Sequence, residues 1–315
     1  MTKTDIQTTR GAEIVSAYTG VEMLVEAWIA AADVSAKTAE TYARAIKQYE
    51  AFLDDNGIDL MHTTRDTVVA YKKHIAATAK PATGNAYLTA VRRFYAYLES
   101  VKVYPNIAAG VKSFKRTKNS PKNALSVEQA KDLLSMDTSS LQGLRDYAII
   151  NLMTRRGLRC VEVARANVED LQTINGEAVL KLQGKGASDK EQYVILRGEC
   201  LKPINDYLAA RGKVEASAPL FAAISNRNKG GRMTTRSISR LVTNELKAEG
   251  IKNPSITAHS LRHTAVTLSL LGGATAQETQ QLARHASIET TFIYAHNLDR
   301  LEAHAERSVD SLLAI

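Results

Sequence analysis

Helical periodicity dominates the first part of the chain. Apolar side chains recur at three- and four-residue spacing in four stretches, and each stretch predicts an amphipathic helix. Ser35 separates the first two stretches as a polar break, and Pro81 stands where the last helix would begin. The stretches cover residues 21–29, 42–53, 64–77 and 87–98. We expect a four-helix domain over residues 17–110, preceded by a flexible tail over residues 1–16.

The remainder of the chain, residues 124–315, is also mainly helical in its pattern, with one interruption. Ser126 opens the pattern of a capping box, which marks the start of a helix. Two runs rich in β-forming residues, 178–183 and 191–196, flank a glycine-containing loop that carries Lys185, and they predict a β-hairpin. Further helical stretches lie at 147–152, 201–208, 238–246, 261–271 and 277–283. This domain is expected to be α+β, mainly α with a small β-sheet.

A strongly basic segment, residues 111–123, lies between the two domains. Pro121 discourages regular structure there, and the segment has no acidic residue. Its basic residues include Lys112, Lys115, Arg116 and Lys118. We interpret it as a linker that is well placed to cross a phosphate backbone, although a merely solvated linker would have the same composition.

Composition narrows the class of partner. Lys and Arg outnumber Asp and Glu by 41 to 33, which favours a polyanionic partner such as DNA, although ordinary solubilising charge gives a similar balance. Cys160 and Cys200 lack the spacing of zinc ligands and are interpreted as reduced, structural thiols. The chain has neither the apolar start of a signal peptide nor a membrane-spanning run, so we expect a cytoplasmic, nucleoid-associated protein without membrane contact.

Four short elements of the second domain carry residues that could do chemistry. Taken singly, each has an ordinary structural explanation, such as an ion pair, a solvated lysine or a packed tyrosine. The elements are Arg159 with Glu162, the loop residue Lys185, His259 with Arg262 and His263, and His285 with Tyr294. Their order and spacing resemble those of the tyrosine recombinase, or phage integrase, family, including Xer-like and simple integrases. The resemblance covers nearly the whole chain, because the family also places a helical, SAM-like core-binding domain first.

This resemblance implies a role for each residue. Tyr294 would be the nucleophile, and Glu162 would support and orient the first catalytic arginine. The activating residues would be Arg159, Lys185, His259, Arg262 and His285. The resemblance implies an enzyme that cleaves and religates duplex DNA through a 3′-phosphotyrosyl intermediate, either to integrate and excise a mobile element or to resolve multimers.

The same residues suit this chemistry on physical grounds. Guanidinium groups bind phosphate oxygens bidentately, and a tyrosine with a pKa near ~10 needs a base or nearby cations to attack at neutral pH. We expect His259 to be the base and His285 a further donor. Lys185 is expected to protonate the leaving 5′ oxygen, with Lys190 as its rival. No cofactor is expected, because the phosphotyrosyl bond conserves the energy of the cut strand.

A catalytic metal is not expected either. His259 and His263 are four residues apart, a spacing that can bind zinc, but Arg262 lies between them and the glutamate of a zinc-protease helix is missing. The sequence also has no acidic cluster suited to holding metal ions. Arginine, lysine and histidine would instead neutralise the phosphate.

The sequence departs from the family pattern at two places. Arg155 and Arg156 stand shortly before Arg159, which leaves Arg156 as an alternative for the catalytic arginine, with Glu162 favouring Arg159. The family commonly has glycine immediately before the catalytic histidine of this region, whereas this chain has Arg284. The second departure puts the local backbone geometry in question.

The resemblance and the charge pattern together predict the partners. We expect Lys72, Lys73, Arg92 and Arg93 to contact duplex DNA that the two domains clamp. The tail, about 297–315, is expected to form a helix that docks on a neighbouring protomer, giving a homotetramer on paired recombination sites; folding back on its own domain is the alternative. An accessory directionality factor could join this assembly.

Two other functions are compatible with parts of the pattern. A type IB topoisomerase shares the nucleophile chemistry, but the separate helical domain and the C-terminal tail favour recombination. A DNA-binding protein with decayed catalytic machinery would also be basic, but all six expected catalytic side chains are present.

Overall fold

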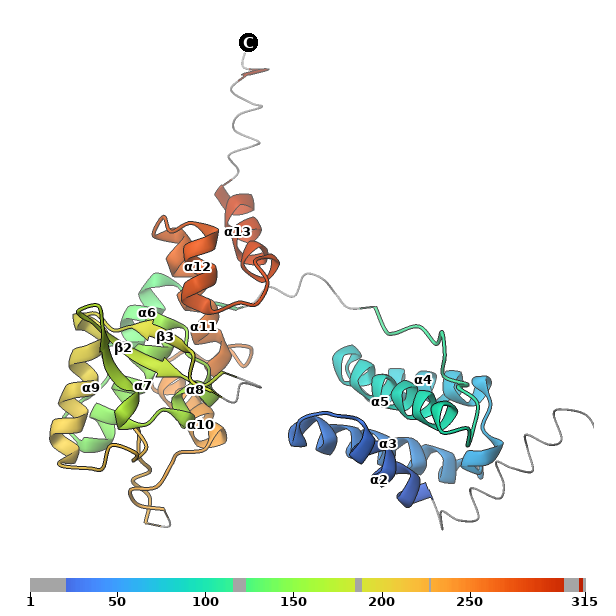
Figure 1. Cartoon of the computed structure of the whole chain (residues 1–315). Helices are drawn as coiled ribbons and strands as arrows, with labels where there is room; N and C mark the ends of the chain where they lie inside the picture. Colours follow the sequence, from blue (N-terminus) through green and yellow to red (C-terminus); the bar gives the residue numbers. More distant parts are fainter. Residues whose placement is uncertain (1–20, 116–122, 185–188, 227, 303–311, 314–315) are drawn as a thin grey trace, which may run out of the picture. The chain divides into compact units, whose positions relative to one another are not determined.

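The computed structural model describes residues 21–115, 123–184, 189–226, 228–302 and 312–313. The chain divides into two compact units, Met1–Ser120 and Pro121–Ile315, and each is described here by itself (Figure 1). No helix of the described residues is both long and apolar enough to cross a membrane.

The first unit contains the four helices that the periodicity predicted. They are α2 (Val21–Ala31), α3 (Ala36–Asp55), α4 (Arg65–Thr78) and α5 (Pro81–Ser100), with a short 3-10 turn, η1, at Leu60–His62. Their starts follow from local chemistry: Ser35 caps α3 by accepting the amide of Thr38, and Thr64 forms a capping box on α4. Pro81 occupies the first turn of α5, where its missing amide hydrogen costs nothing.

Aromatic side chains fill the core of this unit. Trp28 stacks on Tyr42 with ring centroids 5.2 Å apart. Behind them, the buried hydroxyl of Tyr95 bonds to the hydroxyl of Tyr49 at 3.0 Å and to that of Thr63 at 2.8 Å. Buried polar groups need such partners, and this chain of hydroxyls therefore joins α3, α5 and the turn before α4.

The start of the expected linker packs against this first unit. Residues 111–115, hereafter the strap, are fixed by Asn85, whose amide accepts from the Phe114 backbone N–H at 2.8 Å and donates to its carbonyl at 3.2 Å. The Phe114 ring lies against Gly84, the one residue small enough for this approach, and Lys72 lies over the same ring at 5.5 Å.

The second unit consists of helices around a small sheet. The helices are α6 (Val127–Leu133), α7 (Leu141–Arg156), α8 (Cys160–Arg165), α9 (Gly198–Arg211), α10 (Thr235–Ala248), α11 (Ala258–Leu271), α12 (Ala276–Ala283) and α13 (Glu289–Glu302), with the 3-10 turn η2 at Val168–Asp170. The antiparallel sheet has the order β1 (Leu171–Ile174), β2 (Glu177–Leu182) and β3 (Gln192–Ile195). The mainly α fold, the capping box at Ser126 and the β2–β3 hairpin are confirmed.

Strand β1 was not predicted from the sequence. Leu171–Ile174 is short and half exposed, so it carries little periodicity. The signal lay in the connection to β2, because Asn175 and Gly176 both take positive φ, 50° and 82°, as a two-residue hairpin turn requires.

The packing of α7, α11, α12 and α13 places the residues of interest together. α11 packs against α7, α12 and α13 (Figure 1), and buried side chains of α7 belong to the core of this unit. Two left-handed residues end helices at this point: Gly157 after α7, with φ 61°, and Arg284 after α12, with φ 53°. Arg262 of α11 donates to a carbonyl at each of these helix ends, that of Gly157 and that of Ala283.

Gly84→Ala should loosen the strap. An added Cβ would lie 2.6 Å from Phe114 Cε2 and 2.8 Å from Ile75 Cγ2, so the ring must move, and we expect a loss of about 1–3 kcal/mol. The single tryptophan, Trp28, reports on this unit by its fluorescence during urea unfolding of the full chain. Thr83→Ala, at an exposed neighbouring position, is the control. A Gly84→Ala midpoint equal to that of the control would contradict the close packing.

Candidate active site

Arg159 and Glu162 form the first part of the site. Arg159 is the residue before α8, and Glu162, in the first turn of that helix, is fully buried. The Glu162 carboxylate accepts from Arg159 Nη1 at 2.7 Å and from the Arg159 backbone N–H at 2.8 Å. Glu162 therefore fixes both the start of α8 and the direction of the Arg159 side chain, which is 31% exposed.

A second guanidinium reaches the same carboxylate. Arg284 Nη2 lies 2.8 Å from Glu162 Oε2, across 122 residues of sequence. Burial by itself would raise the pKa of Glu162, but the charges of Arg284 and Arg159, together with the Arg159 backbone N–H, lower it below its ordinary value. Glu162 is thus an ionised carboxylate at neutral pH.

Arg262 on α11 is the most deeply placed cation of the site. Its side chain is buried, with Nη1 donating to the Gly157 carbonyl at 2.7 Å and Nη2 donating to the Ala283 carbonyl. Burial, and then the charges of Arg159 and Arg284, lower the pKa of Arg262, but the guanidinium remains charged at neutral pH. Each terminal nitrogen has a second hydrogen, so these bonds leave donors for an anion.

Tyr294, on α13, is buried beside these cations. Its hydroxyl is hydrogen-bonded to Nδ1 of His263, and its ring lies 6.4 Å from the nearly parallel ring of His285. Burial raises the pKa of Tyr294 to about 12, and the positive charge of Arg262 opposes that rise. The phenol is therefore protonated at neutral pH, and a nucleophilic reaction needs a group to accept its proton.

The three histidines have different places at the site. The Tyr294 hydroxyl is hydrogen-bonded to His263, and His259, the base expected from the sequence, packs edge-on against the His263 ring with centroids 4.5 Å apart. His285 Nδ1 pairs with Thr291 Oγ1 at 2.9 Å, which fixes its ring. The sequence analysis gave His263 no catalytic role of its own and weighed it only as part of a possible zinc pair; the described residues contain no group of three or more His, Cys, Asp or Glu side chains suited to a metal ion.

Of the two candidate lysines, Lys190 and Lys185, only Lys190 is among the described residues. Lys190 donates to the buried Asp170 at 2.6 Å, and Asp170 also accepts the Asn167 backbone N–H at 2.6 Å. Lys190 therefore ties the edge of β3 to η2, which does not suit a group that must release its proton to a substrate. Lys185 lies outside the described residues.

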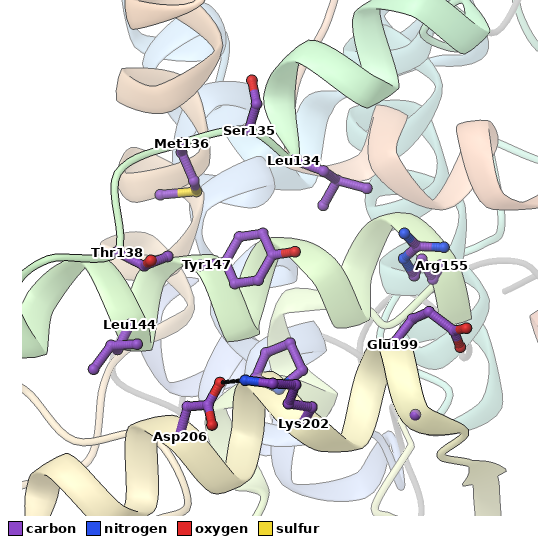
Figure 2. A pocket seen from close by; sticks show the side chains of 12 residues that line it. Leu134, Ser135, Met136, Thr138, Leu144, Tyr147, Arg155, Glu199, Lys202 and Asp206 are labelled. Atoms are coloured by element: carbon purple, nitrogen blue, oxygen red, sulfur yellow. Dashed lines mark hydrogen bonds and ion pairs between the residues drawn. The ribbon is translucent and has the colours of Figure 1, made fainter.

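The arginines before Arg159 point elsewhere. Arg156 Nε donates to the Ile195 carbonyl at 2.9 Å and so joins the end of α7 to β3. Figure 2 shows Arg155 at a cavity of about 610 Å³ that Tyr147 and Lys202 also line. This cavity, beside α7 and α9, has none of the six expected catalytic residues in its lining. These contacts favour Arg159 over Arg156 as the arginine of the site.

The cations expected to bind DNA in the first unit have local contacts as well. Arg92 Nη2 donates to Ser113 Oγ of the strap at 2.9 Å, and Arg93 lies over the Tyr42 ring at 5.7 Å. Lys73, Lys112 and Lys115 are exposed, and Arg116 and Lys118 lie outside the described residues. Arg93 and the three lysines are thus exposed cations of this unit.

Two family models match the chain. Residues 123–300 match the phage integrase family, and residues 22–102 match the phage integrase N-terminal SAM-like domain. The chain belongs to the phage integrase family of tyrosine recombinases. The protein is accordingly an enzyme that breaks and rejoins DNA.

Individual relatives agree with this assignment. Tyrosine recombinase XerC of Pelobacter propionicus is 32% identical to this recombinase over 276 residues, 85% of this chain and 88% of that protein. Tyrosine recombinase XerD of Listeria innocua is 29% identical over 84% of this chain and 89% of its own length. The crystal structure of XerH site-specific recombinase bound to palindromic difH substrate, a post-cleavage complex, has the same fold, with a TM-score of 0.70 and 18% identity over 96% of this chain and 90% of that one.

The contact between Tyr294 and His263 predicts which histidine takes the proton. His263→Ala should slow covalent attachment of DNA to Tyr294 by about 10²-fold or more. The loss should shrink as the pH rises toward the Tyr294 pKa of about 12, because the phenolate then forms without an acceptor. His259→Ala is the matched comparison. Wild-type rates for His263→Ala, with the loss found only in His259→Ala, would return the role of base to His259.

Proposed function

We propose that this protein is a site-specific recombinase that cleaves one DNA strand with Tyr294, holds it as a 3′-phosphotyrosyl intermediate and rejoins it to a different strand. The observation that carries the proposal is the placement of the Tyr294 hydroxyl against His263, next to the buried cation Arg262, in a cluster that also contains Arg159. A buried phenol beside guanidiniums and an imidazole suits nucleophilic attack on an anionic phosphodiester.

Attack by Tyr294 creates a pentacoordinate phosphorus with extra negative charge on its non-bridging oxygens. Arg159 and Arg262 would bind these oxygens through the donors that their protein contacts leave available. The phenolic proton would pass to the imidazole of His263 as the O–P bond forms, and His285 would donate a further hydrogen bond to the phosphate.

Strand release completes the cleavage step. The bond from phosphorus to the 5′ oxygen breaks, and Lys185 would protonate that oxygen to give a free 5′ hydroxyl. Because one phosphoester replaces another, a new 5′ hydroxyl can reverse the step without a nucleotide or other cofactor. Glu162 would support the reaction by orienting Arg159.

Double-stranded DNA recombination sites are the proposed partner. The charge of +8 and the exposed lysines Lys73, Lys112 and Lys115 supply electrostatic contact with phosphates, and Arg116 and Lys118, which lie outside the described residues, would contribute further phosphate contacts. The C-terminal segment would dock on a neighbouring protomer and give a homotetramer on two paired sites; residues 303–311 and 314–315 lie outside the described part of the chain.

Both biological outcomes of such a reaction share all these residues. Integration and excision of a mobile element and resolution of multimers need the same cleavage and religation. They differ in the DNA sites and in accessory proteins such as a directionality factor. Sequencing of recombined plasmids that carry the mapped site in direct and inverted orientation distinguishes them from topoisomerase activity, which relaxes supercoils without exchanging sites.

Tyr294→Phe should bind DNA and form no covalent adduct. The wild type, incubated without metal or nucleotide with nicked fragments of the DNA flanking its gene, should give an SDS-stable adduct that mass spectrometry maps to Tyr294. Arg159→Ala should also lose cleavage, by about 10²–10³-fold, since one donor to the transition state is gone. Cleavage by Tyr294→Phe at the wild-type rate would rule out this nucleophile.

A bridging 5′ sulfur at the scissile phosphate should identify the general acid. A thiolate leaves without protonation, so the sulfur should restore cleavage to Lys185→Ala, which is expected to be about 10²–10⁴-fold slow on ordinary DNA. Lys190→Ala should instead lower the stability of the second unit, because Asp170 would lose its ion-pair partner. Rescue of Lys190→Ala and not of Lys185→Ala would reverse the assignment.

A further inference from the structure

Arg284 lies between the two groups that hold the phosphate-binding arginines. Its Nη2 donates to Glu162 Oε2 at 2.8 Å and to the Gly157 carbonyl at 3.2 Å. Arg159 binds the same carboxylate, and Arg262 binds the same carbonyl. A single guanidinium thus connects the supports of Arg159 and Arg262, which approach the site from α8 and α11.

The burial of Arg284 strengthens its electrostatic interaction with Glu162. Its side chain is 5% exposed, and the Glu162 side chain is fully buried, so solvent screens their interaction little. Arg284 Nη1 also donates to the Leu282 carbonyl at 2.7 Å. The same guanidinium reaches the carbonyl oxygens at the end of α7, where the helix dipole favours a cation.

The backbone at Arg284 does not by itself call for arginine. This residue has φ 53° and ψ 49°, a left-handed conformation that glycine adopts without strain and that disfavours any side chain. Its Nε is buried and has no hydrogen-bond partner among the described residues. Arginine at this position therefore costs free energy twice, through backbone strain and through the buried, unbonded Nε. The two bonds that its Nη2 makes to Glu162 and Gly157 offset these costs.

We propose that Arg284 is a positioning residue for strand cleavage, holding Glu162 and the Gly157 carbonyl so that Arg159 and Arg262 are fixed in the geometry that binds the scissile phosphate. Arg284 itself does not touch the DNA in this assignment. The inference rests on the proposed cleavage by Tyr294 and adds a residue that the pattern of catalytic side chains does not include.

Removal of Arg284 has a specific electrostatic consequence. The charges that act on Glu162 are those of Arg284 and Arg159, with Arg262 facing it from α11. Without Arg284, burial would raise the pKa of the Glu162 carboxyl, and its protonation would remove the ionic hold on Arg159. The defect should therefore be larger in mildly acidic than in mildly alkaline buffer.

The test compares Arg284→Gly with the wild type under single-turnover conditions. The probe is a saturating nicked duplex built on the cleavage site mapped for the wild type, and the measurement is the rate of covalent adduct formation. We expect the rate of adduct formation to fall by about 10²-fold, the effect of displacing a catalytic group by a small distance. The fall should be larger in the acidic buffer. DNA affinity should change no more than in Arg155→Ala, which removes the same formal charge from an exposed position.

A double variant separates positioning from a structural effect. Glu162→Gln combined with Arg284→Gly has no carboxyl to protonate, so the added pH dependence of Arg284→Gly should disappear. If Arg284 had only a structural role, Arg284→Gly would lower the thermal unfolding temperature. Its cleavage rate would then show no added pH dependence for Glu162→Gln to remove. Arg284→Lys keeps a cation but cannot bridge both acceptors with a planar fork, and its rate should be intermediate.

The outcomes are distinct. Saturated cleavage by Arg284→Gly at the wild-type rate in both buffers would overturn the inference and leave the proposed function intact. Wild-type rates for Arg284→Lys would likewise overturn the bridging role, and this variant decides the matter if circular dichroism shows Arg284→Gly unfolded. An absence of any adduct with the wild type would overturn the proposed function itself.

Discussion

The buried carboxylate of Glu162 is the constraint on which the active site depends. In addition to burial, the charges of Arg159 and Arg284 lower the pKa of Arg262, and the charge of Arg159 lowers the pKa of Arg284, so the repulsion among these guanidiniums opposes the fold. One fully buried negative charge and the carbonyls that end α7 and α12 compensate for it. Leaving one partner of a buried ion pair alone costs about 3–5 kcal/mol, so the cluster is stable only as a whole. Two of these cations, Arg159 and Arg284, are thus paired with the same buried anion.

Backbone geometry and charge work together at the two helix ends. Gly157 and Arg284 both take the left-handed conformation, which costs a non-glycine residue roughly 1–2 kcal/mol. Gly157 presents its carbonyl to Arg262, and the turn at Arg284 carries His285 toward Tyr294. The backbone strain at Arg284 is offset by its ion pair with Glu162. The same residue therefore carries strain and joins the end of α12 to α8.

Local chemistry made much of this fold predictable, and tertiary contacts made the rest unpredictable. Ser35, Ser126 and Pro81 begin helices as the sequence indicates, because caps act within one turn. The Asn175–Gly176 pair is an equally local signal for a hairpin turn. It was not used, and strand β1 was therefore not predicted. In contrast, the bonds of Arg284 to Glu162 and of Tyr294 to His263 join residues 122 and 31 positions apart, and no periodicity reports them. The family pattern names residues that take part; it does not say which of them touch.

Tyr294, the proposed nucleophile, is carried on a helix that continues well past it. α13 runs from Glu289 to Glu302, and Tyr294 lies in its first half. At 1.5 Å per residue, its remaining eight residues form a rod of about 12 Å. α13 packs against α11 and α12, so a rotation of this helix about its own axis would move the Tyr294 phenol relative to α11. The direction in which the hydroxyl points therefore depends on the packing of the whole helix and not on Tyr294 alone.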